Sequence, residues 1–279
     1  MSIDDITVVI ATFKSGEKIK KCLNSIDRRA KVIIIENSND SNVKNLEKDY
    51  SNVECILAGS NIGYGCANNI GLKKVTTKYA LILNPDAILH APAMENFINE
   101  SKKISKFAIM GPYIQEEKNM HDKNYLKNIS PVLVNNVKGF AMFLNMKEFE
   151  DIGFFDEDFF FYFEEIDLCK RLIDKGKKIY LIPSINIDHG GGVSHDESIN
   201  DEMELSRSWH WMWSTFNYHK KYKGFLISFF IVLPKLSSAI LKVFIYFLIF
   251  NNKKKIYYQR LSGLLNAMVG KSSWYRPKV

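Results

Sequence analysis

Acidic residues are missing from the last quarter of the chain. The last of them is Glu204, and the 75 residues that follow contain thirteen lysines or arginines. The first 204 residues carry 25 basic and 31 acidic side chains, so the net charge of +7 conceals a mildly acidic body and a strongly basic tail. This asymmetry predicts a polyanionic partner near the tail, either nucleic acid or anionic lipid. Common nucleic-acid-binding motifs are also missing, and the basic residues flank apolar sequence, so the membrane surface is the favoured partner and no nucleic acid is expected.

Cysteine is scarce, and its spacing excludes two further classes of protein. The four cysteines form no C-x-x-C pair, which argues against a structural zinc site and against a disulfide framework. The chain opens Met1-Ser2-Ile3-Asp4-Asp5, without the basic and apolar segments of a secretory signal. We therefore expect a cytoplasmic protein, peripheral on the inner face of the plasma membrane.

Short runs of β-branched and apolar residues recur over the first hundred positions. They predict buried strands over 6–12, 32–35, 53–57 and 79–83, and the intervening segments have helical spacing. Alternation of strand and helix predicts an α/β fold with a parallel sheet covered on both faces. In such sheets ligands bind beyond the carboxyl ends of the strands, where polar clusters lie in this sequence.

The middle of the chain is less regular. A strand is predicted over 138–144 and another over 179–182. Between them, an aromatic stretch over 156–163 leads into a helix that begins at Glu164 and that Gly176 ends.

The tail contains a nearly unbroken apolar run from Phe225 to Phe250, interrupted by Pro234. Its few polar residues share one helical face: Ser228, Lys235, Ser238 and Lys242. A narrow polar stripe beside a broad apolar face predicts a helix lying in a membrane interface and broken at Pro234. The alternative is a helical lid whose apolar face packs on the protein body, because periodicity alone does not distinguish lipid from core.

Three groups of side chains could carry chemistry. Asp86 ends the fourth predicted strand, where a carboxylate can hold a divalent ion that neutralises a diphosphate, or can simply form a turn. Glu164, Glu165 and Asp167 begin a helix, where they stabilise its dipole or supply a general base. His189 precedes three glycines and could bind a metal or a phosphate oxygen.

Taken together, these segments resemble the family 2 glycosyltransferases, and within them the rhamnosyltransferase-like branch of bacterial surface-polysaccharide enzymes. The resemblance covers about residues 5 to 220 and rests on joint order and spacing. The matched segments are Val8 to Phe13, Ile33 to Ser38, Asn61 to Gly65 with Asn69 and Gly71, Leu83 to Asp86, Gly153 to Glu157, Phe161 to Leu168, and His189 with Ser194.

The resemblance implies a Rossmann-like GT-A fold over 1–220 with a mixed, mainly parallel central sheet. Its nucleotide-binding half would span 1–110 and its acceptor half 111–220. A basic amphipathic helical tail over 221–279 would follow and associate with the membrane. Seven residues would contact the nucleotide-sugar, the first three of them at its nucleoside: Thr12, Phe13, Glu36, Asn61, Gly63, Tyr64 and Asn84. Asp86 and His189 would hold Mg²⁺ or Mn²⁺.

The implied reaction is inverting transfer from a nucleotide-sugar, with Glu165 as the base and Asp167 or Glu164 as alternatives. The implied donor is dTDP-rhamnose, with a UDP-hexose as the second choice, and the acceptor is a lipid-linked or cell-surface glycan. The metal motif has one carboxylate, Asn84-Pro85-Asp86, which leaves a catalytically silent membrane-associated scaffold subunit as the rival interpretation. A homo-oligomer is compatible with the sequence. A nucleotidyltransferase would need a glycine-rich basic loop after the first strand, which Thr12-Phe13-Lys14-Ser15-Gly16 does not supply.

Overall fold

The structure is a computed structural model that describes residues 2–113, 130–190 and 194–278, so part of the glycine-rich segment after His189 lies outside the described residues. By their internal contacts the residues divide into two compact units. The first unit is Met1–Phe155 with Glu165–Asp196, and the second is Asp156–Glu164 with Glu197–Val279.

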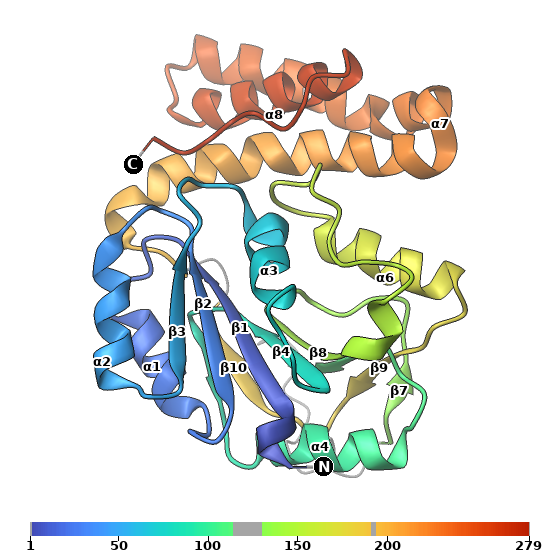
Figure 1. Ribbon diagram of the computed structural model, residues 1–279. Helices are drawn as coiled ribbons and strands as arrows, with labels where there is room; N and C mark the ends of the chain where they lie inside the picture. The colour runs from blue at the N-terminus through green and yellow to red at the C-terminus, as the bar shows by residue number, and fades with distance from the viewer. Residues whose placement is uncertain (1, 114–129, 191–193, 279) are drawn as a thin grey trace. The chain divides into compact units, whose positions relative to one another are not determined.

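Four parallel strands form one half of the sheet in the first unit, as the sequence predicts (Figure 1). They are β1 (Ile6–Thr12), β2 (Lys31–Glu36), β3 (Val53–Leu57) and β4 (Tyr79–Leu83). β1 is central, and its Val9 lies opposite Ile33 of β2 and Ile82 of β4. These strands are almost continuously apolar because the sheet is covered on both faces.

Antiparallel pairings complete the sheet, whose order is β3-β2-β1-β4-β8-β6-β9-β7. The added strands are β6 (Ile109–Pro112), β7 (Val132–Leu133), β8 (Ala141–Asn145) and β9 (Ile179–Ile182). β8 runs antiparallel to both β4 and β6, whereas β6 and β9 are parallel. A separate antiparallel pair, β5 (Ala87–Leu89) and β10 (Ile187–His189), follows the end of β4. The predicted mixed, mainly parallel sheet is therefore confirmed.

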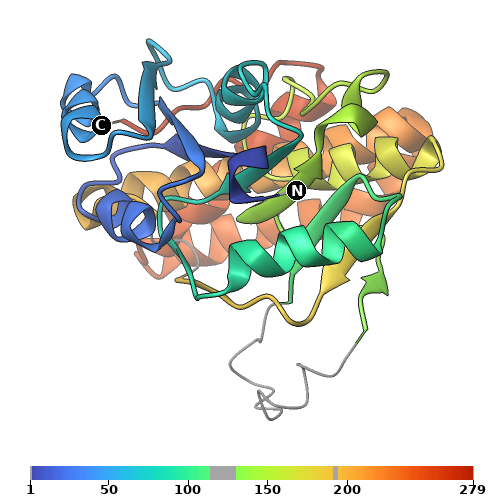
Figure 2. The ribbon, with the colours of Figure 1, turned by 60° about the horizontal axis from the view of Figure 1, so that its bottom comes forward.

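Helices cover the two faces of the sheet. They are α1 (Lys18–Ser25), α2 (Leu46–Asp49), α3 (Tyr64–Leu72), α4 (Ala93–Lys103) and α6 (Glu164–Asp174). Side chains of α1, α2 and α4 join one core with Val8 and Ile10, and side chains of α3 and α6 join the other with Val9. Alternate residues of β1 thus point to opposite cores. Figure 2 shows α1 (blue) and α4 (green) on one side of the strands and α3 (teal) on the other. Short 3₁₀ turns are η1 (Ile3–Asp5), η2 (Ser41–Asn45), η3 (Met146–Phe149) and η4 (Glu197–Ile199).

The second unit is built from α7 (Asn200–Leu248) and α8 (Lys253–Met268). The predicted break of α7 at Pro234 is wrong, because the backbone leaves helical geometry at Gly224 instead, with φ 76° and ψ 170°. Glycine has no Cβ to oppose a positive φ, and the helix continues through Pro234 despite the lost hydrogen bond and the crowding of its ring against the preceding turn. Phe216 contacts Phe225 across the break, and Trp211 lies under Lys235, so the two segments of α7 form an antiparallel hairpin.

The polar stripe of the hairpin contacts neighbouring helical segments. Ser228 is buried and donates to the carbonyl of Gly224, and the half-buried Lys242 donates to the hydroxyl of Tyr257 in α8. Lys235 is exposed and lies over the ring of Trp211. Many large apolar side chains of the segment are also exposed: Phe225, Leu226, Ile227, Phe230, Leu233, Ile240, Leu241, Phe244, Ile245, Phe247 and Leu248. A helix on a protein core would usually bury such a face.

The aromatic segment Asp156–Glu164 belongs to the second unit. Phe159 is fully buried with Trp209, Trp213 and Phe216, and Ser214 donates a hydrogen bond to the carbonyl of Phe161. Lys221 pairs with Asp156 at 2.6 Å. Tyr162 and Phe163 both have a positive φ, 67° and 71°. Two consecutive left-handed aromatic residues are strained, so the packing of this segment must hold them in place.

α8 crosses α7 at Gly263, where a Cβ would collide with the backbone carbonyl of Trp209. We predict that Gly263→Ala separates the two helices and destabilises the protein by about 1–3 kcal/mol. Thermal unfolding followed by circular dichroism should show a Tm lowered by several degrees. The control is Leu265→Ala in the same helix, where the side chain is 45% exposed. Equal Tm values for the two variants would contradict the close crossing.

Candidate functional site at the strand ends

The polar residues that follow β1 and β2 are tied together by Asn37. Its backbone NH donates to the carbonyl of Thr12 at 2.9 Å. Its side-chain oxygen accepts from the NH of Ile62 at 2.9 Å, and its amide donates to Asn61 at 3.1 Å and to the carbonyl of Gly63 at 3.3 Å. Asn37 therefore fixes the loop that carries Asn61 and Gly63. Asn37 lies in the matched segment Ile33 to Ser38, but the resemblance implies no role for it.

Two of the predicted nucleoside contacts are buried at this edge. Thr12 lies at the end of β1, and its hydroxyl donates to the carbonyl of Ile35 at 3.4 Å. Glu36 is 3% exposed, and its carboxylate accepts from the backbone NH groups of Ser38 and Asp40. These bonds make Glu36 an organiser of the turn after β2. Phe13 is half-buried, and its NH donates to the hydroxyl of Ser15.

Asp86 and His189 lie together at the end of β4. The pairing of β5 with β10 places His189 opposite Ala87, next to Asp86. The imidazole Nε2 is 3.6 Å from Oδ1 of Asp86 and 3.1 Å from Nδ2 of Asn84. Phe140 stacks on the imidazole with the ring centroids 4.3 Å apart, and its carbonyl accepts from the NH of Asn84 at 2.8 Å. All these residues belong to the first unit.

Burial sets the charge of His189. Loss of hydration lowers its pKa, and the carboxylate of Asp86 opposes that shift. The imidazole is therefore neutral at pH 7, as a metal ligand must be. With the Asn84 amide as donor, Nε2 is the acceptor nitrogen and the ring proton lies on Nδ1, a tautomer assigned from the hydrogen bond.

The donor atoms at this corner fit a hard divalent ion. Both carboxylate oxygens of Asp86 and the side-chain oxygen of Asn84 are buried without a hydrogen-bond partner. Oxygens of this kind are costly to bury unless a ligand satisfies them, and they are the ligands that Mg²⁺ and Mn²⁺ prefer. Within residues 2–113, 130–190 and 194–278, no cluster of three His, Cys, Asp or Glu side chains could hold a metal. Asp86 and His189 would thus need further ligands from the diphosphate or water.

Glu165 lies near the start of α6, beside the glycine that precedes β8. A Cβ on Gly139 would be 3.7 Å from Cβ of Glu165 and 3.7 Å from the ring of Tyr64, whose hydroxyl donates to the Gly139 carbonyl. Burial raises the pKa of the Glu165 carboxyl, and Lys138 opposes that shift. A carboxylate with a raised pKa is a stronger proton acceptor, as a general base requires.

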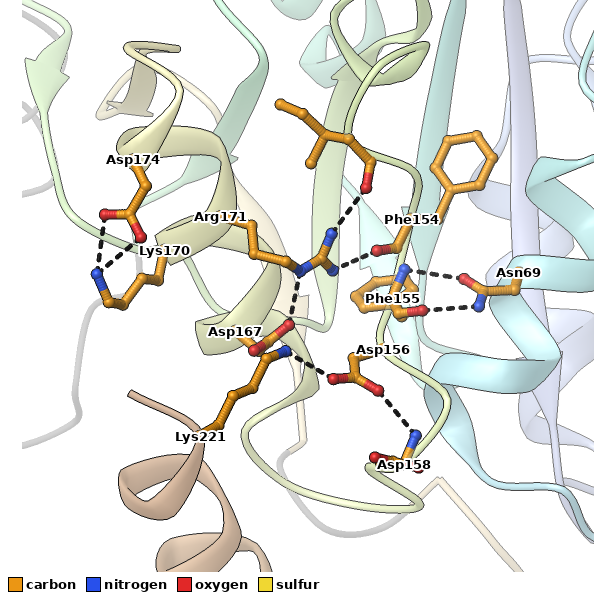
Figure 3. A network of polar contacts seen from close by, with 11 residues as sticks. Asn69, Phe154, Phe155, Asp156, Asp158, Asp167, Lys170, Arg171, Asp174 and Lys221 are labelled. Carbon is orange, nitrogen blue, oxygen red and sulfur yellow. Dashed lines mark hydrogen bonds and ion pairs between the residues drawn. The ribbon is translucent and has the colours of Figure 1, made fainter. Parts of the chain in front are cut away.

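The two other acidic candidates differ from Glu165. Asp167 is fully buried and forms an ion pair with Arg171 at 2.7 Å (Figure 3). Arg171 also donates to the carbonyls of Ile152 and Phe154, so this pair fastens α6 to the preceding segment. Glu164 is buried and is grouped with the second unit.

Two hydrogen bonds of Asn69 hold the segment around Phe155 to α3. The Asn69 amide donates to the carbonyl of Phe155 at 2.9 Å, and its oxygen accepts from the NH of Phe155 at 3.0 Å (Figure 3). Asn69 was one of the matched residues of the resemblance, and this geometry gives it a structural role.

The dipeptide Gly139-Phe140 connects the candidate residues. Glu165 and Tyr64 contact its glycine, whereas His189 stacks on its phenylalanine. Asn84 is hydrogen-bonded to the same dipeptide. Asp86 and His189 on the one hand, and the Glu165 carboxylate on the other, are therefore linked through the two residues that precede β8.

This architecture is that of the GT-A glycosyltransferases. The family model of glycosyl transferase family 2 matches residues 7–169, more than half of the chain, and the chain belongs to that family.

Individual relatives agree with this assignment. The chain is 27% identical over 251 residues to the rhamnosyltransferase WbbL of Escherichia coli, covering 76% of this chain and 92% of WbbL. It is 25% identical over 191 residues to the low-salt glycan biosynthesis hexosyltransferase Agl10 of Haloferax volcanii, covering 61% of this chain and 62% of Agl10. The match thus spans less than two thirds of the length of Agl10.

A solved structure shares the fold. The mannosyltransferase PcManGT from Pyrobaculum calidifontis, in complex with GDP-Man and Mn²⁺, aligns with a TM-score of 0.53 and 12% identity. The alignment covers 95% of this chain and 86% of that one.

We predict that Arg171→Met strongly destabilises the protein, because it removes the guanidinium that pairs with the buried carboxylate of Asp167. The expected loss is about 3–5 kcal/mol, measured by chemical denaturation. Lys170→Met is the matched control, since Lys170 pairs with Asp174 on the exposed face of the same helix. That exposed pair contributes at most about 1 kcal/mol. Similar losses of stability in both variants would contradict a role of the Arg171–Asp167 ion pair in fastening α6 to the preceding segment.

Proposed function

We propose that this protein transfers a sugar from a nucleoside diphosphate-sugar to a hydroxyl group of a lipid-linked or cell-surface glycan, with inversion at the anomeric carbon. The observation that carries the proposal is the buried, unpartnered carboxylate of Asp86 beside His189, with Glu165 on the other side of Gly139-Phe140. Family membership and the presence of a nucleotide-sugar and Mn²⁺ in PcManGT support it.

The proposed donor is dTDP-rhamnose, with a UDP-hexose as the alternative. Similarity to WbbL and to the N-acetylglucosaminyl-diphospho-decaprenol L-rhamnosyltransferase of Mycobacterium tuberculosis, 21% identical over 233 residues, supports rhamnose. Thr12, Phe13 and Glu36 would line the nucleoside pocket. Asn61, Gly63 and Tyr64, in the segment that Asn37 helps to fix, would border the nucleotide-sugar.

In the proposed mechanism, Glu165 accepts the proton of the acceptor hydroxyl while the hydroxyl oxygen attacks the anomeric carbon. Desolvation keeps the Glu165 carboxylate basic until that proton arrives. Asp86 and His189 would hold Mg²⁺ or Mn²⁺, and the ion would neutralise the diphosphate and the charge that develops on it as it departs. Burial of these residues excludes water that would otherwise hydrolyse the donor.

We further propose that the tail holds the protein at the cytoplasmic surface of the membrane. α7 is the one helix in the described part of the chain that is long and apolar enough to span a bilayer by composition, and only 17% of its most apolar window is buried. The break at Gly224, the contact of Lys235 with Trp211 and the hydrogen bond of Lys242 to Tyr257 favour a hairpin lying on the membrane over a straight span. A lipid-linked acceptor would reside in the same membrane.

We predict that Asp86→Asn and Glu165→Gln both abolish transfer but differ in donor binding. Asp86→Asn should remove the Mn²⁺-dependent rise in Tm that nucleoside diphosphates cause by mass action. Glu165→Gln should keep that rise and lower kcat by about 10²–10⁴-fold, as expected for loss of a general base.

The control is Asp174→Asn at the exposed end of α6. The assay compares dTDP-, UDP- and GDP-sugars in a thermal-shift screen and a transfer assay. A blank result in both assays for every donor would contradict an enzyme and favour the scaffold alternative.

The raised pKa of Glu165 predicts a pH dependence on the acidic side. The base is active only when deprotonated, so kcat should fall as the pH drops through a pKa above 4.5, the usual value for glutamate. Glu165→Asp should retain part of the activity with a shifted acidic limb. A rate that is independent of pH on the acidic side, with chemistry rate-limiting, would argue against Glu165 as the base.

A further inference from the structure

Two cations in the second unit share one aromatic ring. Lys242 of α7 lies 4.9 Å from the centroid of Tyr257 in α8 and donates to its hydroxyl at 3.3 Å. The guanidinium carbon of Arg260 is 5.1 Å from the same centroid. Tyr246 stacks on this ring at 5.4 Å, with an angle of 20° between the planes. Lys242 and Arg260 are both half-buried, so neither is a freely solvated surface charge.

No acidic side chain adjoins these cations in the sequence, since none follows Glu204. Among the described residues, Nε of Arg260 is buried without a hydrogen-bond partner. Two like charges that share one ring repel each other, and a buried unsatisfied donor costs free energy. The electron-rich face of Tyr257 compensates only in part. The arrangement therefore favours an anionic ligand that accepts hydrogen bonds from both side chains.

The surroundings of the cluster identify the ligand as a lipid. Exposed apolar side chains of the same segment, such as Leu241, Phe244 and Ile245, lie next to Lys242 in the chain. A cavity of about 300 Å³ with an almost wholly apolar wall lies between the same two helices. It is lined by Leu205, Val243, Phe247, Lys254, Lys255, Tyr258 and Gln259, so the chain neighbours of Lys242, Tyr257 and Arg260 form part of its wall. An apolar cavity whose wall also carries cations matches a molecule with a hydrocarbon chain and an anionic head.

We propose that Lys242, Tyr257 and Arg260 form a binding site for the phosphate group of a membrane lipid. The planar fork of Arg260 and the ammonium group of Lys242 would each donate to phosphate oxygens, and the Tyr257 hydroxyl would supply a further donor. The proposal rests on the membrane association proposed above. It adds a defined binding site for a lipid headgroup to the general attraction between the basic tail and an anionic membrane. The phosphate could belong to a bilayer phospholipid or to the carrier of a lipid-linked acceptor.

The test measures co-flotation of the full-length protein with vesicles. Four compositions share a phosphatidylcholine background: phosphatidylcholine alone, with phosphatidylglycerol, with a polyprenyl diphosphate, and with oleate at matched negative charge. The site predicts tighter binding to one or both phosphate-bearing anionic lipids than to oleate. Which of the two lipids binds more tightly identifies the source of the phosphate.

The site variant is Lys242→Gln with Arg260→Gln, and the charge-matched control is Lys253→Gln with Lys271→Gln, two exposed lysines of the second unit that do not line the cavity. The site variant should lose the preference for phosphate over oleate, a change of about tenfold or more in relative affinity, whereas the control should keep it. Tyr257→Phe, which keeps the ring, should weaken the preference without unfolding the protein and serves as the readout if the double variant is unstable. Circular dichroism verifies folding of each variant.

The outcomes separate the two proposals. If the wild-type protein floats with no vesicle, the membrane association itself is wrong and the headgroup site is wrong with it. If the wild type floats equally with phosphate lipids and oleate, or if both double variants lose affinity in parallel, the headgroup site is overturned and diffuse membrane association stands. The transfer reaction is tested independently with soluble acceptors.

Discussion

The buried carboxylate of Asp86 is the constraint on which the candidate site depends. Burying a charge without hydrogen bonds is unfavourable unless a ligand completes the site. The fold around Asp86 must therefore offset the desolvation cost of its carboxylate. The β5–β10 pair does so by fixing His189 beside it, and the stacked Phe140 closes the corner. Phe140 follows Gly139, which lies beside Glu165, so this dipeptide contacts both His189 and Glu165. The chemistry proposed here follows from that single arrangement.

Much of the sheet could be predicted from the sequence, but less of the site. β1, β3, β4 and β9 begin and end where the apolar runs do, because strands buried on both faces are almost continuously apolar. Asp86 and Glu165 stood out as carboxylates at element ends. The contact between Asp86 and His189 could not be derived, because it depends on a pairing of three-residue strands far apart in sequence. The role of Asn37 was equally hidden, since a polar residue after a strand is ordinarily just a turn former.

The tail shows the limit of periodicity in another way. Spacing correctly grouped Lys235 and Lys242 on one face of a helix, but it could not tell which face is covered. In the structure Lys235 lies over Trp211 and Lys242 contacts Tyr257, while many large apolar side chains of the same segment are exposed. Pro234 looked like the natural break, yet Gly224 is where the chain reverses, because a reversal needs a positive φ more than it needs a missing NH group.

The interleaving of the two units has a consequence for how the protein can be dissected. The chain enters the second unit at Asp156, leaves it at Glu164 and returns at Glu197, so no single cleavage separates the two. Removing everything after residue 220 would strip Phe159 and its aromatic neighbours of part of their core, including Val232 and Leu264. A soluble truncation would therefore disturb the polypeptide immediately before Glu165. The unit with the exposed apolar segment and the unit with the candidate base are therefore linked through the chain around Asp156–Glu164. Neither can be shortened without altering the other.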